Sequence, residues 1–285
     1  MFILVRYFSK KMLCVDLNPH PDLLEFIESL KIVHVNFATE KHLSHLYTYV
    51  PNYSQFLCIH LADRIRIKNI NTKYEICPGI LLIGPQLLTS KLDLGRLYKC
   101  VVVAFKPSGL YRMTNIPHCK IINKWLNARD ILGTEIETLF ARIVEAKGDE
   151  EINTIIQKYL LLKLINLQPS KPFDIAILQL IRASGNVSIE DVASQSCVSI
   201  RQLERIALSR IGVSPKHYSK LVRFSQAYKY KEAHPSTPWV NIAYRFGYYD
   251  HMHFIHDFKS FVGCTPGYIE EEEFKMSIKL QRLME

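Results

Sequence analysis

The sequence predicts an α+β protein whose N-terminal half is mostly β and whose C-terminal half is helical. Two observations predict this class. Short runs of β-branched and aromatic residues, separated by turn signals, fill residues 30–115, and from Ala128 onward the apolar residues recur at helical spacing. A third observation, an internal repeat, divides the helical half into two similar units. A chain of 285 residues is long enough for two domains.

Four segments of the N-terminal half are predicted to be strands. Turn signals that contain proline or glycine separate them, for example Pro78-Gly79. Because residues 100–105 are apolar throughout, we expect that strand to be buried on both faces or packed inside a barrel. The four predicted strands are residues 31–37, 56–61, 80–83 and 100–105.

Helices are predicted from residue 128 onward. Two of them, over residues 128–144 and 151–167, precede residues 168–172, where two prolines in five residues indicate a linker. The next helix is predicted over residues 173–184 and ends at a Gly-Asn pair. Candidate N-caps of the later helices are Ser188, Ser214 and Thr237.

Charge and composition limit the class of protein. The net charge of +9 and the pI of about 9.1 favour a polyanionic partner. Residues 171–268 hold 12 basic and 7 acidic groups, so charge alone does not locate the binding region. Seven cysteines occur singly, which argues against a disulfide framework or a zinc site. No apolar run reaches the roughly 18 residues that span a bilayer. We expect a cytoplasmic protein without a cofactor, a metal or membrane contact.

An internal repeat organises the C-terminal region. Val192-Ala193 recurs as Ile242-Ala243 fifty residues later, and Cys197 matches Gly247 at the same offset. One residue is then inserted, and the remaining pairs are 51 residues apart. These pairs are Ser199 with Asp250, Leu203 with Phe254, Gly212 with Gly263, and Pro215 with Pro266.

Each unit of the repeat has the composition of a helix-turn-helix. The alanine lets two helices cross closely, and the turn residue is expected to have a positive φ, which is natural for Gly247 and mildly costly for Cys197. In this motif the second helix enters the major groove of DNA. Two such units in register, joined by a helix predicted over residues 214–233, predict a DNA-binding domain. A helical bundle with accidental similarity is the alternative.

The same residues resemble the AraC/XylS family of transcription regulators, over about residues 173–269. The most specific stretches are residues 247–254 (Gly-Tyr-Tyr-Asp-His-Met-His-Phe) and 263–266 (Gly-Cys-Thr-Pro). The resemblance implies two helix-turn-helix subdomains joined by a long helix, with both recognition helices facing adjacent major-groove segments. Ile269 stands where the family often has Tyr at the end of the second unit. His256 stands where Arg is common, and this second departure leaves the base preference open.

The N-terminal half is similar to the small cupin-like β-barrel sensor domains that precede such units in one branch of the family. The matching stretches include residues 84–86 (Gly-Pro-Gln) and 103–109 (Val-Ala-Phe-Lys-Pro-Ser-Gly). The resemblance implies a cupin-like barrel with C-terminal flanking helices and a sensor or oligomerisation role. We therefore expect a sensor domain over residues 1–167, a linker over 168–172, a DNA-binding domain over 173–269 and an acidic, amphipathic tail over 270–285.

The first recognition helix carries three candidates for base contact. Arg201, Glu204 and Arg205 lie at i, i+3 and i+4, opposite the inward stripe. Arginine pairs with guanine O6 and N7, and glutamate accepts from cytosine N4. The alternative is a solvated ion pair between Glu204 and one of the arginines. The inward stripe comprises Leu203, Ile206 and Ala207.

The second recognition helix is expected to discriminate less between bases, because histidine and methionine contact bases less specifically than arginine. Phe254, Phe258 and Phe261 are expected to point inward. The candidate base contacts are His251, Met252 and His256, and the candidate phosphate or supporting contacts are Lys216, Ser236, Thr237, His253 and Lys259.

Two other classes of function are weighed against DNA reading. No nucleophile-elbow, zinc-protease or phosphate-loop motif occurs, and His42 and His45 lack a nearby third metal ligand. Residues 117–120 (Pro-His-Cys-Lys) hold the elements of an alkyltransferase acceptor site in a different order, so methyl transfer to Cys119 would identify that enzyme. A sequence-blind architectural protein is the second alternative, and the modest positive charge argues against it.

The sequence thus predicts a sequence-specific DNA-binding transcription regulator and not an enzyme. Its expected partner is double-stranded DNA. RNA polymerase, an unidentified small-molecule effector and a second copy in a homodimer are further candidate partners. The tail has four glutamates at residues 270–273, followed by Phe274 and Ile278 at i, i+4. One possibility is a frayed terminus. The other is a regulatory tail, which either lowers the affinity for non-specific DNA or docks on the N-terminal domain and holds the DNA-binding half inactive.

Overall fold

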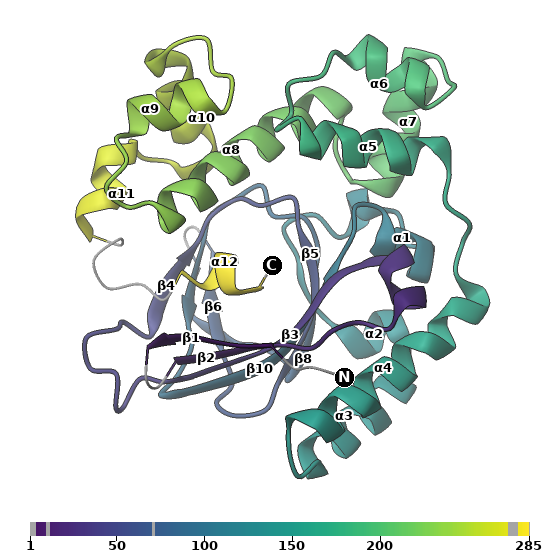
Figure 1. Cartoon of the computed structure of the whole chain (residues 1–285), viewed down its shortest axis with the longest axis vertical. Coiled ribbons are helices and arrows are strands. Elements are labelled where there is room, and N and C mark those ends of the chain that lie inside the picture. The colour runs from purple at the N-terminus through teal and green to yellow at the C-terminus, as the bar shows by residue number, and fades with distance from the viewer. Residues whose placement is uncertain (1–3, 10–11, 70–71, 273–278, 285) are drawn as a thin grey trace.

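The N-terminal half of the chain forms a ring of strands, with helices along one side and the C-terminal helices beyond one edge (Figure 1). The computed structural model describes residues 4–9, 12–69, 72–272 and 279–284. The predicted α+β class, with a mostly-β barrel followed by helices, is confirmed.

The barrel consists of two antiparallel sheets. The larger has the order β1-β2-β3-β10-β5-β8-β11, formed by Leu4–Ser9, Met12–Asp16, Ile27–Asn36, Leu97–Phe105, Gln55–His60, Ile80–Ile83 and Trp125–Asn127. The smaller has the order β4-β9-β6-β7, formed by Leu46–Tyr49, Ser90–Asp93, Arg66–Lys68 and Glu75–Ile76. The four strands predicted from the sequence correspond to β3, β5, β8 and β10, so these predictions are confirmed.

Residues 100–105 of strand β10 are buried on both faces, as their apolar sequence predicts. Cys100 and Val102 pack in the core between the two sheets, while Val101 and Val103 pack on the other face under the flanking helices. Successive side chains of a strand point to opposite faces, so a strand covered on both sides must be apolar at every position. The flanking helices are α2 (Ala128–Leu132), α3 (Glu135–Glu145) and α4 (Asp149–Lys163).

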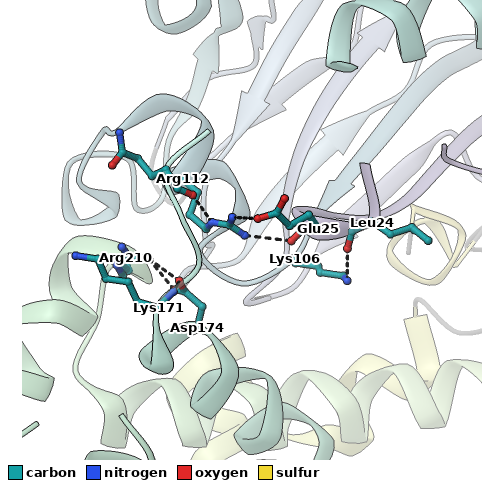
Figure 2. A network of polar contacts seen from close by, with 8 residues as sticks. Leu24, Glu25, Lys106, Arg112, Lys171, Asp174 and Arg210 are labelled. Atoms are coloured by element: carbon teal, nitrogen blue, oxygen red, sulfur yellow. Dashed lines mark hydrogen bonds and ion pairs between the residues drawn. The ribbon is translucent and has the colours of Figure 1, made fainter. Parts of the chain in front are cut away.

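Short helices lie between strands of the barrel, and one of them follows the last flanking helix. They are η1 (Pro21–Glu25), α1 (Gly109–Thr114), η2 (His118–Lys120) and η3 (Leu164–Asn166). Residues 167–171 have no regular structure. Arg112 of α1 holds this segment, because its Nε donates to the Gln168 carbonyl at 2.7 Å while its guanidinium pairs with Glu25 of η1 (Figure 2).

The next seven described helices build two small cores. They are α5 (Pro172–Arg182), α6 (Ile189–Gln195), α7 (Ile200–Arg210), α8 (Pro215–Ala233), α9 (Trp239–Arg245), α10 (His251–Val262) and α11 (Pro266–Glu272). Helix α8 contributes to both cores and also touches the barrel, where the Ser225 hydroxyl donates to Asn52 Oδ1 at 3.2 Å. Tyr53 and Leu87 of the barrel pack against both helical cores.

The last described helix, α12 (Leu280–Met284), returns to the barrel and lies inside the ring of strands (Figure 1). Leu280, Leu283 and Met284 belong to the core between the two sheets. The anchoring expected of Phe274 and Ile278 concerns residues outside the described part of the chain. None of the described helices has the length and hydropathy needed to cross a membrane.

Candidate nucleic-acid interface

The two repeat units have the same turn between their helices. The residue at the turn has a positive φ in both, 55° at Cys197 and 77° at Gly247. A non-glycine residue is uncommon in this conformation, so Cys197 carries a small strain that Gly247 avoids. The expectation drawn from the repeat is therefore confirmed at both turns.

Equivalent side chains cap the two recognition helices. Ser199 accepts a hydrogen bond from the backbone N–H of Gln202 at 3.3 Å at the start of α7. Asp250 accepts one from His253 at 2.7 Å at the start of α10. Each cap satisfies a backbone donor that the helix leaves without a partner.

The ends of the two units also correspond. Gly212 and Gly263 both have a φ of 88°, and a proline three residues later begins the next helix, α8 in the first unit and α11 in the second. Where the two helices of each unit cross, Ala193 and Ala243 are buried. A larger side chain at these positions would separate the helices.

One predicted cap is wrong. Helix α9 begins at Trp239 with Pro238 in the N-cap position, and no side chain caps it. Thr237 instead supplies its carbonyl oxygen to Lys231 Nζ at 2.9 Å. The fixed φ of proline sets the entry into the helix here, so a hydroxyl cap is not required. Thr237 is half-buried and Ser236 is exposed.

The first recognition helix presents its predicted polar face. Arg201, Glu204 and Arg205 are exposed, while Leu203 and Ala207 are buried and Ile206 is partly buried. None of the three polar residues forms an ion pair with another described residue. The surface pair considered for Glu204 is therefore not formed, and all three side chains face solvent.

The second recognition helix presents a mixed surface. Met252 is 69% exposed and His256 is also exposed, whereas His251 and His253 are half-buried. Phe254, Phe258 and Phe261 are buried, as predicted. The candidate base contacts of this helix therefore lie at or near its outer surface.

A buried carboxylate underlies this second surface. Asp257 is 2% exposed, and its oxygens lie 3.6 Å from Lys220 Nζ, 3.7 Å from His253 Nε2 and 3.8 Å from His256 Nδ1. Burial and the Lys220 charge lower the pKa of the nearby His217, against the opposite effect of Asp257. A buried carboxylate with one lysine and two imidazoles around it therefore lies beneath the outer face of α10.

Other exposed residues flank the two helices. Lys216 lies in the first turn of α8, and Lys259 lies in the last turn of α10. Sequence reasoning missed Tyr249, which is 89% exposed immediately before the α10 cap. The sequence feature that could have revealed it is the extra residue in the second repeat unit. Tyr248 fills the buried position after the turn, so the extra residue, Tyr249, lies on the surface.

The geometry around Cys119, His42 and His45 bears on the two alternative chemistries, alkyl transfer and metal binding. Cys119 is exposed while the neighbouring His118 is buried against the ring of Tyr111. His45 bonds Asp93 at 2.9 Å and His42 lies 3.7 Å from Glu40. Among the described residues no group of three metal-ligating side chains converges.

Comparison with protein-family models agrees with this interpretation of the helices. Residues 192–271 match the family model of a helix-turn-helix domain. No curated protein matches the chain. Among solved structures, ToxT from Vibrio cholerae is similar at 14% identity over 86% of this chain and 98% of that one, with a TM-score of 0.47. The apo form of a ToxT variant from strain SCE256 gives 13% identity over 85% and 96%, with a TM-score of 0.48.

Proposed function

We propose that this chain, whose residues 192–271 form an AraC-type helix-turn-helix domain, regulates transcription by reading two adjacent major-groove segments of DNA. The duplicated unit is the observation that carries the proposal. Both copies have a capped second helix that buries its apolar stripe and leaves polar side chains on the outside. A major groove about 12 Å wide admits one such helix.

The first unit supplies most of the sequence discrimination. Arg201 and Arg205 are exposed on one face of α7 and contact guanines, and Glu204 between them accepts from cytosine. The absence of ion pairs at these side chains, among the described residues, supports this role because no ion pair must first be broken.

The second helix-turn-helix unit contributes a less strict preference for particular bases. Met252 packs against thymine methyl groups, and His251 and His256 each donate or accept one hydrogen bond at a base edge. His253 supports the helix from its half-buried position beside Asp257. Lys216, Lys259, Ser236 and Thr237 contact phosphates and fix the register of the protein on the duplex.

The N-terminal barrel, within residues 1–167, modulates the DNA-binding half as a sensor or oligomerisation domain, and residues 168–172 link the two. Its packing against both helical cores supports this role, since Tyr53 and Leu87 touch each of them. Double-stranded DNA is the principal partner. A small-molecule effector, a second copy of the chain and RNA polymerase are the further partners to be tested.

The direct test is selection of bound duplexes from a random pool, followed by anisotropy titrations of the selected and a scrambled duplex at one fixed salt concentration. The proposal expects the selected duplex to bind at least about 10³-fold more tightly, the lower range for specific binding. Equal affinities would place the protein among sequence-blind binders, and no binding at all would refute the proposed function.

A further inference from the structure

Helix α12 occupies the space between the two sheets of the barrel (Figure 1). Leu280, Leu283 and Met284 are at most 2% exposed there. The backbone of α12 also reaches the barrel wall, because the Cys14 thiol of β2 donates to the Leu283 carbonyl at 3.8 Å. A segment far from the barrel in sequence thus completes the inter-sheet core.

One polar side chain of α12 fits the barrel specifically. Gln281 is 1% exposed, and its side-chain amide accepts from the Val50 N–H at 3.1 Å and donates to the Val50 carbonyl at 3.0 Å. Tyr47 donates its hydroxyl to the same Oε1 at 3.2 Å and accepts from the Gln281 backbone N–H, also at 3.2 Å. A buried amide satisfied at both ends marks a defined binding site, not a chance apolar contact.

The residues that hold α12 also lie beside the DNA-binding half. The side chain of Val50 belongs to the core that contains Leu221 and Phe224 of α8. Tyr47 lies close enough to Glu232 of α8 that this charge, after burial, raises the pKa of Tyr47. Helix α12 also contacts α8 directly. Removing α12 therefore takes away part of the support on which α8 rests.

In this arrangement the N-terminal domain faces part of the first recognition helix. Arg205, Ile206 and Ser209 line a cleft of 570 Å³ together with Tyr111 of α1. The last residue of α7, Arg210, lies over the Tyr111 ring at 4.9 Å. A DNA duplex does not fit into such a cleft, so a duplex that reaches Arg205 from the Tyr111 side requires Tyr111 and α7 to separate.

We propose that the space between the sheets is a binding site for this chain's own helix α12, and that its occupation holds α8 on the barrel and keeps the Arg205 side of α7 closed. Release of α12 loosens the contacts at Val50 and Tyr47 and allows the cleft at Tyr111 to open. The inhibitory role rests on the proposed function, whereas the occupation of the barrel does not. The docked state lowers the apparent DNA affinity by the fraction of molecules that are closed.

Thiol labelling of the full chain tests the occupation. Cys14 is 3% exposed beneath α12, and Cys119 is exposed and serves as the internal standard. Gln281→Ala removes the three side-chain hydrogen bonds, and Gln168→Ala is the matched control, because the exposed Gln168 bonds the barrel only through its backbone. Iodoacetamide alkylation, mapped by mass spectrometry, should be at least about tenfold faster at Cys14 in Gln281→Ala than in wild type or control. Equal rates overturn the proposal.

The inhibitory step is tested on the duplex selected as described above. Gln281→Ala should bind it severalfold more tightly than wild type and the Gln168→Ala control, and Arg205→Ala in the same chain should abolish this gain. Leu283→Ala provides a second release variant, and circular dichroism verifies that each variant is folded. Unchanged or weaker binding overturns the inhibitory role. If no form of the protein binds DNA, the proposed function has failed, while the Cys14 result still decides whether α12 occupies the barrel.

Discussion

Arg210 and Asp174 form a buried, two-pronged ion pair between α7 and α5, in which Arg210 Nη1 lies 2.8 and 2.7 Å from the two carboxylate oxygens (Figure 2). Asp174 also accepts from the Lys171 N–H at 2.8 Å at the start of α5. The pair thus joins the first recognition helix to the helix that follows the linker.

Arg210→Ala is expected to destabilise the protein by about 3–5 kcal/mol, because it leaves the Asp174 carboxylate buried without its partner. Urea denaturation followed by circular dichroism measures the loss. The matched control is Arg205→Ala on the same helix, which removes an exposed arginine and should leave the midpoint unchanged. Equal midpoints for the two variants would mean that the ion pair contributes no stability.

Arg201→Ala and Arg205→Ala are each expected to reduce discrimination between the selected and random duplexes by about 1–3 kcal/mol, without changing the melting temperature. The reason is that both side chains are exposed on α7 and carry no structural contact that an alanine would break. Parallel titrations on the two duplexes measure the effect. An equal loss on both would assign these arginines to phosphate contacts instead.

Ala243→Leu and Phe254→Asp are expected to abolish DNA binding through the fold of the second unit. Both side chains are fully buried. The larger side chain overpacks the helix crossing at a cost of about 1–3 kcal/mol, and the aspartate places an unpaired charge among aromatic rings. Thermal melts provide the measurement, with Val240→Ala at an exposed position of α9 as the control. A melt like that of wild type would show that the inward stripe is misassigned.

Acid should destabilise the protein through His118. Burial lowers the pKa of His118 to about 3, partly opposed by a backbone interaction with Arg210. The unfolded chain takes up this proton near pH 6.5 and the folded chain does not, so stability is lost as the pH falls below 6.5, by about 1.4 kcal/mol per pH unit. Denaturation between pH 7 and 4 should show this slope in wild type and a smaller one in His118→Leu. The exposed His42→Gln should behave like wild type.

Local chemistry explains which features could be predicted from the sequence. The turns at Cys197 and Gly247 and the caps at Ser199 and Asp250 depend on a few neighbouring residues, and the repeat shows each of them twice. The strand β10 was predictable because a strand buried on both faces must be apolar. The Thr237 cap was wrong because the neighbouring proline governs the same position.

Non-local packing explains what the sequence could not predict. Gln281 and Val50 are 231 residues apart, and no periodicity links a tail glutamine to a barrel backbone. The closed cleft at Tyr111 likewise depends on how two domains dock. Whether Arg201, His251 or Lys216 touches DNA depends on a partner that neither the sequence nor the fold contains.

The short segment over residues 167–171 limits how far the two halves can separate. Five fully extended residues span about 17 Å, so the first helix-turn-helix unit stays within that reach of the barrel even after the contacts at Arg112 are broken. A tether of this length gives an effective concentration in the millimolar range. Reclosing is therefore a first-order process, and the balance between open and closed molecules should not change when the protein is diluted.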